Sequence, residues 1–297
     1  MAETWALEPG DDITERYVVM KKLGGGHSYE VYLAQDSHRL ALVVIKLLRP
    51  DLVGDPAGNR RLAREAKVLG QLAHPAIVRS FGADFEGECP HLVLEHLEGP
   101  HLSRLIRQNG ALALEQVIPL AIQICSAAHY IEQEGFVHLD IKPRNIIMGG
   151  PPRLIDMSIA RQLADAHRIR SPMGSDPYMA PEQCDPTRAA VSTPADVWGI
   201  GATLYHAVTG LRPFPRAKNF DRADPLQRWP QLREAPEPLP KSVPSDLGAV
   251  IKDCLAPDPA TRPSALEIVE RLEPLVQALP SRPVLRHQRP RLGRRRT

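Results

Sequence analysis

Residues 137–147, Val137-His138-Leu139-Asp140-Ile141-Lys142-Pro143-Arg144-Asn145-Ile146-Ile147, decide the fold of this chain. The stretch holds a carboxylate, a lysine and a carboxamide between apolar flanks. The flanks anchor its two ends, and Pro143 keeps the middle from becoming a helix. We therefore expect a rigid loop that presents Asp140, Lys142 and Asn145 to one cleft, an arrangement that suits a transfer reaction governed by positioning.

Each of these three polar side chains has a use in moving a charged group. Asp140 can accept a proton from a hydroxyl, Lys142 can neutralise a phosphoryl group in transit, and Asn145 can hold a metal ion. Aspartate, lysine and asparagine are also ordinary loop residues. The motif is therefore specific only in combination with its neighbours along the chain.

Upstream of this loop, a glycine-rich segment precedes a lysine in an apolar run. Residues 17–23 predict a strand that leads into Gly24-Gly25-Gly26. Three glycines between two strands predict a hairpin whose backbone can approach phosphate groups closely. The apolar run over residues 40–45 then ends in Lys46, and a buried strand rarely carries a charge unless that charge is paired or binds something.

A helix is predicted over residues 59–72, because apolar residues recur on one face of it. Glu65 lies beside that face and is the natural ion partner of Lys46. On the helix pattern alone it would be a surface charge near Arg61 and Arg64. The order of the surrounding motifs favours the pairing with Lys46.

Two downstream segments complete the pattern. Residues 153–161 predict a short strand that ends near Asp156, and residues 174–182 read Gly-Ser-Asp-Pro-Tyr-Met-Ala-Pro-Glu. With the loop around Asp140 and the glycine-rich hairpin, these segments resemble the protein kinase family in its bacterial serine/threonine form. The match over residues 174–182 is the most specific one, and the resemblance extends from residue 17 to about residue 277.

The resemblance implies an α+β fold with two lobes, a protein-kinase-like fold. A small, β-rich N-lobe would occupy about residues 17–95, and a larger, mainly α-helical C-lobe about residues 100–277. Within the latter, the residues themselves predict helices over 101–109 and 113–134, the second from apolar residues at helical spacing. Residues 1–16 would form an N-terminal segment with little structure. Residues 278–297 would form a basic, disordered tail.

The resemblance also implies ATP and Mg²⁺ as cofactors and assigns the site residues. Asp140, Lys142, Asn145, Lys46 and Glu65 would take part in catalysis, and Asn145 and Asp156 would hold the metal ion. The residues implied to contact the nucleotide are Leu23, Gly24, Gly26, Val31, Val44, Lys46, Glu95, Leu97 and Ile147.

Two further residues are implied to be structural anchors. Asp196 would steady the backbone of the loop around Asp140, and Arg262 would form a buried ion pair with Glu182. In isolation, Asp196 could be a helix N-cap and Arg262 a charge on a surface loop. Neither of these readings explains why both residues fall in the order and spacing of one family.

Three departures from the family pattern bear on activity. Tyr29 replaces the third glycine of the hairpin and places a ring near the phosphates or the substrate mouth. Ser158 replaces the glycine two positions after Asp156. Leu139 stands where activated kinases often carry an arginine that pairs with a phosphate on the activation segment. We therefore predict that phosphorylation of Ser171 or Ser175 is not the main on-switch.

The resemblance implies a serine/threonine protein kinase that transfers the γ-phosphoryl group of ATP to hydroxyl groups of protein substrates. The alternative is an ATP-binding pseudokinase scaffold with little or no catalysis, for which the three departures are the motivation. Every polar group that the chemistry needs is present, which favours activity.

Composition and charge limit the remaining possibilities. The 297 residues are 43% hydrophobic and 24% charged, as is typical of a soluble globular chain. The four cysteines are far apart, which argues against a disulfide framework or a zinc site. No apolar run approaches the roughly 18 residues of a membrane helix, so we expect a cytoplasmic protein without a transmembrane segment. The oligomeric state does not follow from the sequence.

The net charge of +2 conceals a basic C-terminal end. Residues 281–297 carry seven arginines and no acidic residue, so removing their charge leaves −5 for residues 1–280. Such a tail could contact an acidic partner, nucleic acid or anionic lipid. It could equally be a solvated end without a dedicated partner.

Overall fold

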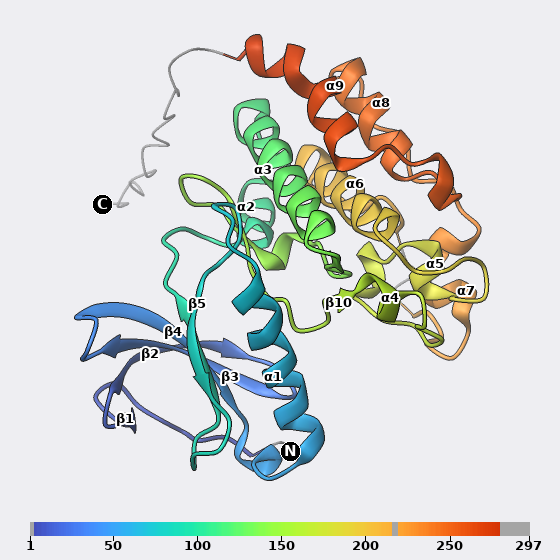
Figure 1. The fold of residues 1–297 in the computed structure, drawn as a ribbon. Helices are drawn as coiled ribbons and strands as arrows, with labels where there is room; N and C mark the ends of the chain where they lie inside the picture. The colour runs from blue at the N-terminus through green and yellow to red at the C-terminus, as the bar shows by residue number, and fades with distance from the viewer. Residues whose placement is uncertain (1–2, 216–218, 280–297) are drawn as a thin grey trace, which may run out of the picture.

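The computed structural model describes residues 3–215 and 219–279, and it confirms the bilobal α+β fold (Figure 1). A β-rich lobe is built from residues up to 95, and a mainly helical lobe follows. The basic tail predicted over residues 278–297 lies outside the described residues from residue 280 onward. None of the described helices combines the length and the apolar character that crossing a lipid bilayer would need.

The small lobe contains a six-stranded antiparallel sheet in the order β1-β2-β3-β4-β6-β5. Its strands are β1 (Asp12–Thr14), β2 (Tyr17–Gly25), β3 (Tyr29–Asp36), β4 (Ala41–Leu48), β5 (Ser80–Asp84) and β6 (His91–Glu95). Helix α1 (Pro56–Gln71) packs against it (Figure 1). The helix begins three residues earlier than predicted because the Asp55 side chain caps it, accepting from the amides of Ala57 and Gly58.

Strand β3 separates two environments by strict alternation. Glu30, Tyr32 and Ala34 are buried on one face, where Tyr32 and Ala34 join the apolar core of the small lobe. Tyr29 and the other odd-numbered residues of the strand are half-buried on the opposite face. Successive side chains of a strand point to opposite faces, so this alternation fixes which residues of β3 can reach the predicted site.

The N-terminal segment has more structure than predicted. Trp5 donates a hydrogen bond from Nε1 to the carbonyl oxygen of Leu48 (2.7 Å), and Trp5 and Leu7 pack against the small-lobe core. Ile13, in β1, is buried in that core. The expectation of little structure over residues 1–16 was therefore wrong for the described part. These few apolar side chains lie in a largely polar stretch, but all of them contribute to the small-lobe core.

The second lobe is mainly helical. Its α-helices are α2 (Leu102–Asn109), α3 (Leu114–Gln133), α4 (Leu163–Ala166), α5 (Pro181–Cys184), α6 (Pro194–Thr209), α7 (Pro225–Arg228), α8 (Ser245–Cys254) and α9 (Ala265–Gln277). Its short strands are β7 (Phe136–Val137), β8 (Ile146–Ile147), β9 (Arg153–Leu154) and β10 (Arg161–Gln162). The 3₁₀ turns of the chain are η1 (Pro50–Leu52), η2 (Pro143–Asn145), η3 (Asp176–Tyr178), η4 (Pro230–Leu232) and η5 (Pro259–Thr261).

Helix α6 lies at the centre of this lobe. It is buried over nearly its whole length and packs against α3 on one side and α8 on the other (Figure 1). A helix that is apolar all round needs such surroundings. The bounds of α2 and α3 differ by one residue at most from those predicted. A rigid central helix is well placed to anchor functional loops at its N-terminal end.

We expect acid to weaken the small lobe through Glu30. Burial opposes the charge of this side chain, but hydrogen bonds from Lys22 (2.7 Å) and Tyr32 outweigh that effect and lower the pKa of Glu30 from 4.5 to about 2. Because the unfolded chain then binds the proton more readily, this stabilisation is complete above about pH 4.5 and is lost as the pH falls toward about 2.

Urea midpoints measured across that pH range check this prediction. Replacing Glu30 by glutamine should flatten the dependence of the midpoint on pH relative to the wild type. Equal slopes for the two proteins would contradict it.

Candidate active site

The loop around Asp140 is anchored by the N-terminal end of α6. The buried carboxylate of Asp196 accepts hydrogen bonds from the backbone amides of His138 and Leu139, both at 2.7 Å. Leu139 has a φ of 68°, a conformation unfavourable for leucine that these two bonds stabilise. These contacts confirm the predicted role of Asp196 as an anchor. They fix the backbone just before Asp140 and so the position of its side chain.

The three polar residues of the loop come together. Lys142 Nζ lies 2.5 Å from Asp140 Oδ2, and the Asn145 amide donates to the backbone oxygen of Asp140 (3.0 Å) and to Oδ2 (3.2 Å). Oδ1 of Asp140 is buried and has no hydrogen-bond partner among the described residues. One carboxylate oxygen is therefore oriented by two neighbours, while the other is available to accept a proton.

Sequence reasoning missed a fourth member of this group. Ser175 belongs to the activation segment, the stretch between Asp156 and Glu182. Its Oγ lies 2.5 Å from Lys142 Nζ. It was considered only as a candidate for phosphorylation. The one available signal was a hydroxyl residue inside the most specific motif, and nothing local indicates which side chain it meets 33 positions away.

A second cluster links the two lobes. Lys46 on β4 pairs with Glu65 on α1 (2.6 Å) and with Asp156, just after β9 (3.1 Å). The predicted pairing of Lys46 with Glu65 is confirmed, and the side chain of Glu65 is fully buried. Lys46 and Asp156 are 110 positions apart in the sequence, and their side chains meet in this cluster.

Lys46 and Asp156 stabilise each other's charge in this cluster. Burial opposes the positive charge of Lys46, but Glu65 and Asp156 outweigh it and hold the pKa of Lys46 above its ordinary value. Burial also opposes ionisation of Asp156, yet Lys46 and the Ser158 side chain keep its pKa well below the usual range. A lysine held charged beside an ionised aspartate can bind phosphate and metal together.

The residues present fit a magnesium ion that is shared with phosphate groups. The bonds of the Asn145 side chain to Asp140 use its nitrogen, which leaves Oδ1 for a metal, and Asp156 meets Lys46 through Oδ1, which leaves Oδ2. Mg²⁺ prefers oxygen ligands and is often held by one or two protein groups plus substrate phosphates. The described chain has no group of three or more His, Cys, Asp or Glu side chains that could hold a metal ion.

The residues implied to contact the nucleotide come from four parts of the fold. They are Leu23, Gly24 and Gly26 in and after β2, Val31 and Val44 on β3 and β4, Glu95 and Leu97 at the end of β6 and beyond it, and Ile147 on β8. Val31 lies directly opposite Lys46 in the sheet register, so the two share one face. Contact of these residues with a nucleotide stays a prediction.

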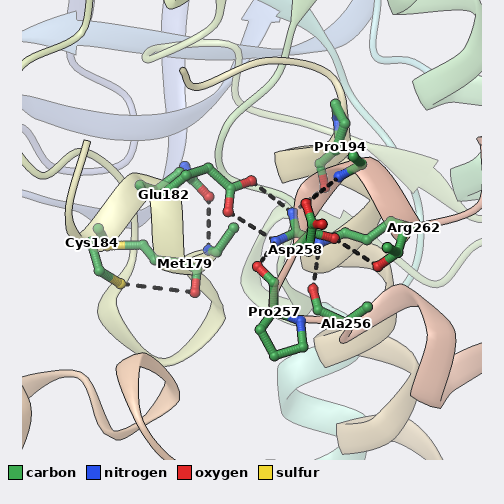
Figure 2. Close-up of polar contacts among 12 residues, drawn as sticks. Met179, Glu182, Cys184, Pro194, Ala256, Pro257, Asp258 and Arg262 are labelled. Atoms are coloured by element: carbon green, nitrogen blue, oxygen red, sulfur yellow. Dashed lines mark hydrogen bonds and ion pairs between the residues drawn. The ribbon is translucent and has the colours of Figure 1, made fainter. Parts of the chain in front are cut away.

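The end of the activation segment is held by a buried ion pair, as predicted. Both side chains are almost fully buried, and Glu182 accepts two hydrogen bonds from Arg262 (2.6 and 2.9 Å; Figure 2). Arg262 also donates to the backbone oxygens of Ala256 (2.8 Å), Pro194 (2.8 Å) and Pro257 (3.2 Å). One guanidinium thus ties α5, the start of α6 and the residues after α8 together.

The proline-rich stretch over residues 212–244 supports the activation segment. Arg228 and Trp229 donate to the carboxylate of Asp176 (3.0–3.1 Å). Gln231 donates to the backbone oxygens of Asp176 (2.8 Å) and Met179 (3.1 Å). The segment that carries Ser175 is therefore held in place by Arg228, Trp229 and Gln231, which lie more than 50 positions later in the chain.

Taken together, fold and site define a bilobal protein with one lysine–carboxylate cluster for phosphate and one loop with an oriented carboxylate. The protein kinase domain family matches residues 17–272, and the chain belongs to this family.

Curated relatives agree with that assignment. The serine/threonine-protein kinase PknB of Mycobacterium tuberculosis is 31% identical over 265 residues, which cover 84% of this chain and 41% of that protein. PkaA of Streptomyces coelicolor is 33% identical over 288 residues, or 90% and 51%. The probable serine/threonine-protein kinase CE0033 of Corynebacterium efficiens is 32% identical over 294 residues, or 93% and 43%. The match thus spans about half or less of the length of these relatives.

Proposed function

We propose that the chain is a serine/threonine protein kinase that transfers the γ-phosphoryl group of ATP to hydroxyl groups of protein substrates. The observation that carries this proposal is the group of Asp140, Lys142, Asn145 and Ser175, held at 2.5–3.2 Å beside one unpartnered carboxylate oxygen. The relatives named as serine/threonine kinases support the choice of acceptor.

In this proposal Asp140 orients the acceptor hydroxyl and takes its proton on Oδ1. Lys142, which already touches Asp140 and Ser175, offsets the charge of the phosphoryl group during transfer. Lys46, held by Glu65, binds the phosphates of the nucleotide. Kinase chemistry depends mainly on positioning and electrostatic stabilisation, which is what this set of fixed side chains supplies.

Asn145 and Asp156 would hold Mg²⁺ through their remaining oxygens. The ion, when bound, neutralises charge on the phosphates. Adenine would lie on the face of the sheet that carries Val31 and Val44, with Ile147 on the other side and the backbone of Glu95 and Leu97 at its edge.

Transfer of label from γ-labelled ATP tests this proposal. The purified chain, with Mg²⁺ and a generic protein substrate, should label serine and threonine after acid hydrolysis of the product. Label on tyrosine alone would contradict the acceptor class. Binding of MgATP without any transfer would instead support the pseudokinase scaffold.

We also propose that the kinase domain covers residues 17–277 and that the protein acts in the cytoplasm. The basic residues after 280, which lie outside the described chain, would contact an acidic partner, nucleic acid or anionic lipid. Binding to such a polyanion should weaken steeply with salt and disappear when residues 281–297 are deleted. Binding that ignores both changes would contradict this.

We predict that replacing Ser171 by alanine leaves most of the transfer activity intact. The side chain of Leu139 is uncharged and buried in the apolar core. It therefore cannot pair with a phosphate on the exposed Ser171. Transfer rates of the wild type and of Ser171→Ala, both with verified folding, check this. A large loss would show that a phosphate on this segment is needed.

Ser175→Ala is the informative contrast. We expect it to lower the transfer rate roughly tenfold, because it removes the hydroxyl that contacts Lys142 and leaves this lysine less well positioned. Threonine at this position keeps the hydroxyl and should restore activity.

A further inference from the structure

Tyr29 lies at the start of β3, on the face of the sheet that carries Lys46. It stands two residues before Val31, which is directly opposite Lys46 in the register. Residues two apart on a strand point to the same face, so Tyr29 is a diagonal neighbour of Lys46. Lys46 Nζ lies 4.7 Å from the centroid of the Tyr29 ring, within the range of a cation–π contact.

The backbone of Tyr29 is tied to the glycine-rich hairpin. Gly26 donates its amide hydrogen to the carbonyl oxygen of Tyr29 (2.8 Å). A Cβ atom on Gly25 would lie 2.7 Å from the same oxygen, so glycine is needed for this close approach. The ring that contacts Lys46 is therefore carried by backbone that is tied to the hairpin.

The hydroxyl of Tyr29 is buried and has no hydrogen-bond partner among the described residues. Burial raises the pKa of Tyr29 to about 12, although Lys46 opposes this shift. At neutral pH the group is thus an uncharged donor. A buried hydroxyl without an acceptor is unfavourable, because its desolvation is not offset by a hydrogen bond. A ligand that brings an acceptor next to it supplies that hydrogen bond, while the hydroxyl is already desolvated.

The neighbours of this hydroxyl indicate which acceptor fits. Lys46 already has carboxylates at two sides, Glu65 and Asp156, and the Tyr29 ring at a third. A further ligand of Lys46 that also accepts from the Tyr29 hydroxyl would lie next to the ring, and negative charge on it would complement the lysine. The phosphate chain of a nucleotide meets both conditions and offers oxygens as acceptors.

We propose that Tyr29 is a nucleotide-binding residue of this chain, whose ring covers Lys46 and whose hydroxyl donates a hydrogen bond to a phosphate oxygen. The inference rests on the nucleotide-binding part of the proposed function, but not on catalysis. The competing acceptor within the chain is the carboxylate of Glu65, whose charge also acts on Tyr29. A bond to Glu65 would stabilise the nucleotide-free protein, whereas a bond to phosphate would act only when nucleotide is present.

Calorimetric titration with MgATP and with adenosine, in the absence of protein substrate, separates these possibilities. Tyr29→Phe should weaken MgATP binding roughly tenfold or more, as expected for a lost hydrogen bond to a charged acceptor. Adenosine binding should not change, because it involves no phosphate, and the melting temperature without nucleotide should not fall, because the hydroxyl then has no partner to lose. Tyr29→Gly, which also removes the ring, should bind MgATP no better than Tyr29→Phe.

Tyr32→Phe is the matched control. Tyr32 lies on the same strand with its side chain on the opposite face, and its hydroxyl bonds to Glu30. This variant should lower thermal stability and leave MgATP affinity unchanged, the reverse of the Tyr29→Phe pattern.

Several results would overturn the inference. Unchanged MgATP affinity in Tyr29→Phe would show that the hydroxyl does not meet a phosphate, and a lower melting temperature without nucleotide would assign it to Glu65. Tighter MgATP binding by Tyr29→Gly would show that the ring only obstructs the site. A wild-type chain that binds neither ligand would overturn the proposed function itself, whereas binding without transfer would leave the role of Tyr29 fully testable.

Discussion

Replacing Asp140 by asparagine is expected to reduce the rate of phosphoryl transfer by about 10²–10⁴-fold, the usual contribution of a positioned general base. The carboxamide retains the shape of the side chain but does not accept the hydroxyl proton. The backbone oxygen of Asp140, which accepts from Asn145 at 3.0 Å, is unchanged. Lys142 keeps its contact with Ser175. The loop should therefore stay in place, and MgATP affinity should change little.

Initial transfer rates and calorimetric affinities measured on the same preparations check this. Asp51→Asn, a change of the same kind at an exposed position of the small lobe, is the matched control and should behave like the wild type. Equal rates for the wild type and Asp140→Asn would remove the catalytic role of this carboxylate. A joint loss of transfer and MgATP binding would indicate a distorted loop instead.

Two kinds of feature could be predicted from the sequence: helices with a regular apolar pattern, and charged residues whose position requires a partner. The bounds of α3 followed from its apolar periodicity, because a helical face that packs on a core must repeat at helical spacing. Lys46 in an apolar strand required a partner, and the order of the surrounding motifs selected Glu65, which the helix pattern alone would have left as a surface charge. Asp196 and Arg262 were placed as anchors by the family resemblance, because in isolation they could be a helix N-cap and a charge on a surface loop.

The contacts that were missed depend on how distant segments pack. Ser175 reaches Lys142, and Trp229 reaches Asp176 across 53 positions, only after the activation segment has folded against the second lobe. No local pattern encodes either distance. The order of the N-terminal segment was missed for a related reason. Trp5 and Leu7 stand in a short, largely polar stretch, and the core surface on which they pack exists only once the sheet has formed.

We predict that replacing Arg262 by alanine destabilises the second lobe by about 3–5 kcal/mol, the cost of leaving a buried charge without its partner. Without Arg262, water could not solvate the charge of Glu182, because the Glu182 side chain is only 1% exposed. Three backbone oxygens would lose their donor as well. Urea unfolding of the wild type and the variant gives the difference in free energy directly.

An exposed pair in the same lobe provides the matched control for Arg262→Ala. Arg271 and Asp253 also lie 2.8 Å apart, but their side chains are 37% and 46% exposed. Solvent replaces most of that interaction, so Arg271→Ala should cost no more than about 1 kcal/mol. A double-mutant cycle with Glu182→Gln then isolates the buried pair, and a coupling energy as small as that of the exposed pair would contradict its anchoring role. If the anchor holds, the cost of Arg262→Ala should also fall when Glu182 is already neutral, because the stranded charge, rather than lost packing, is then its main source.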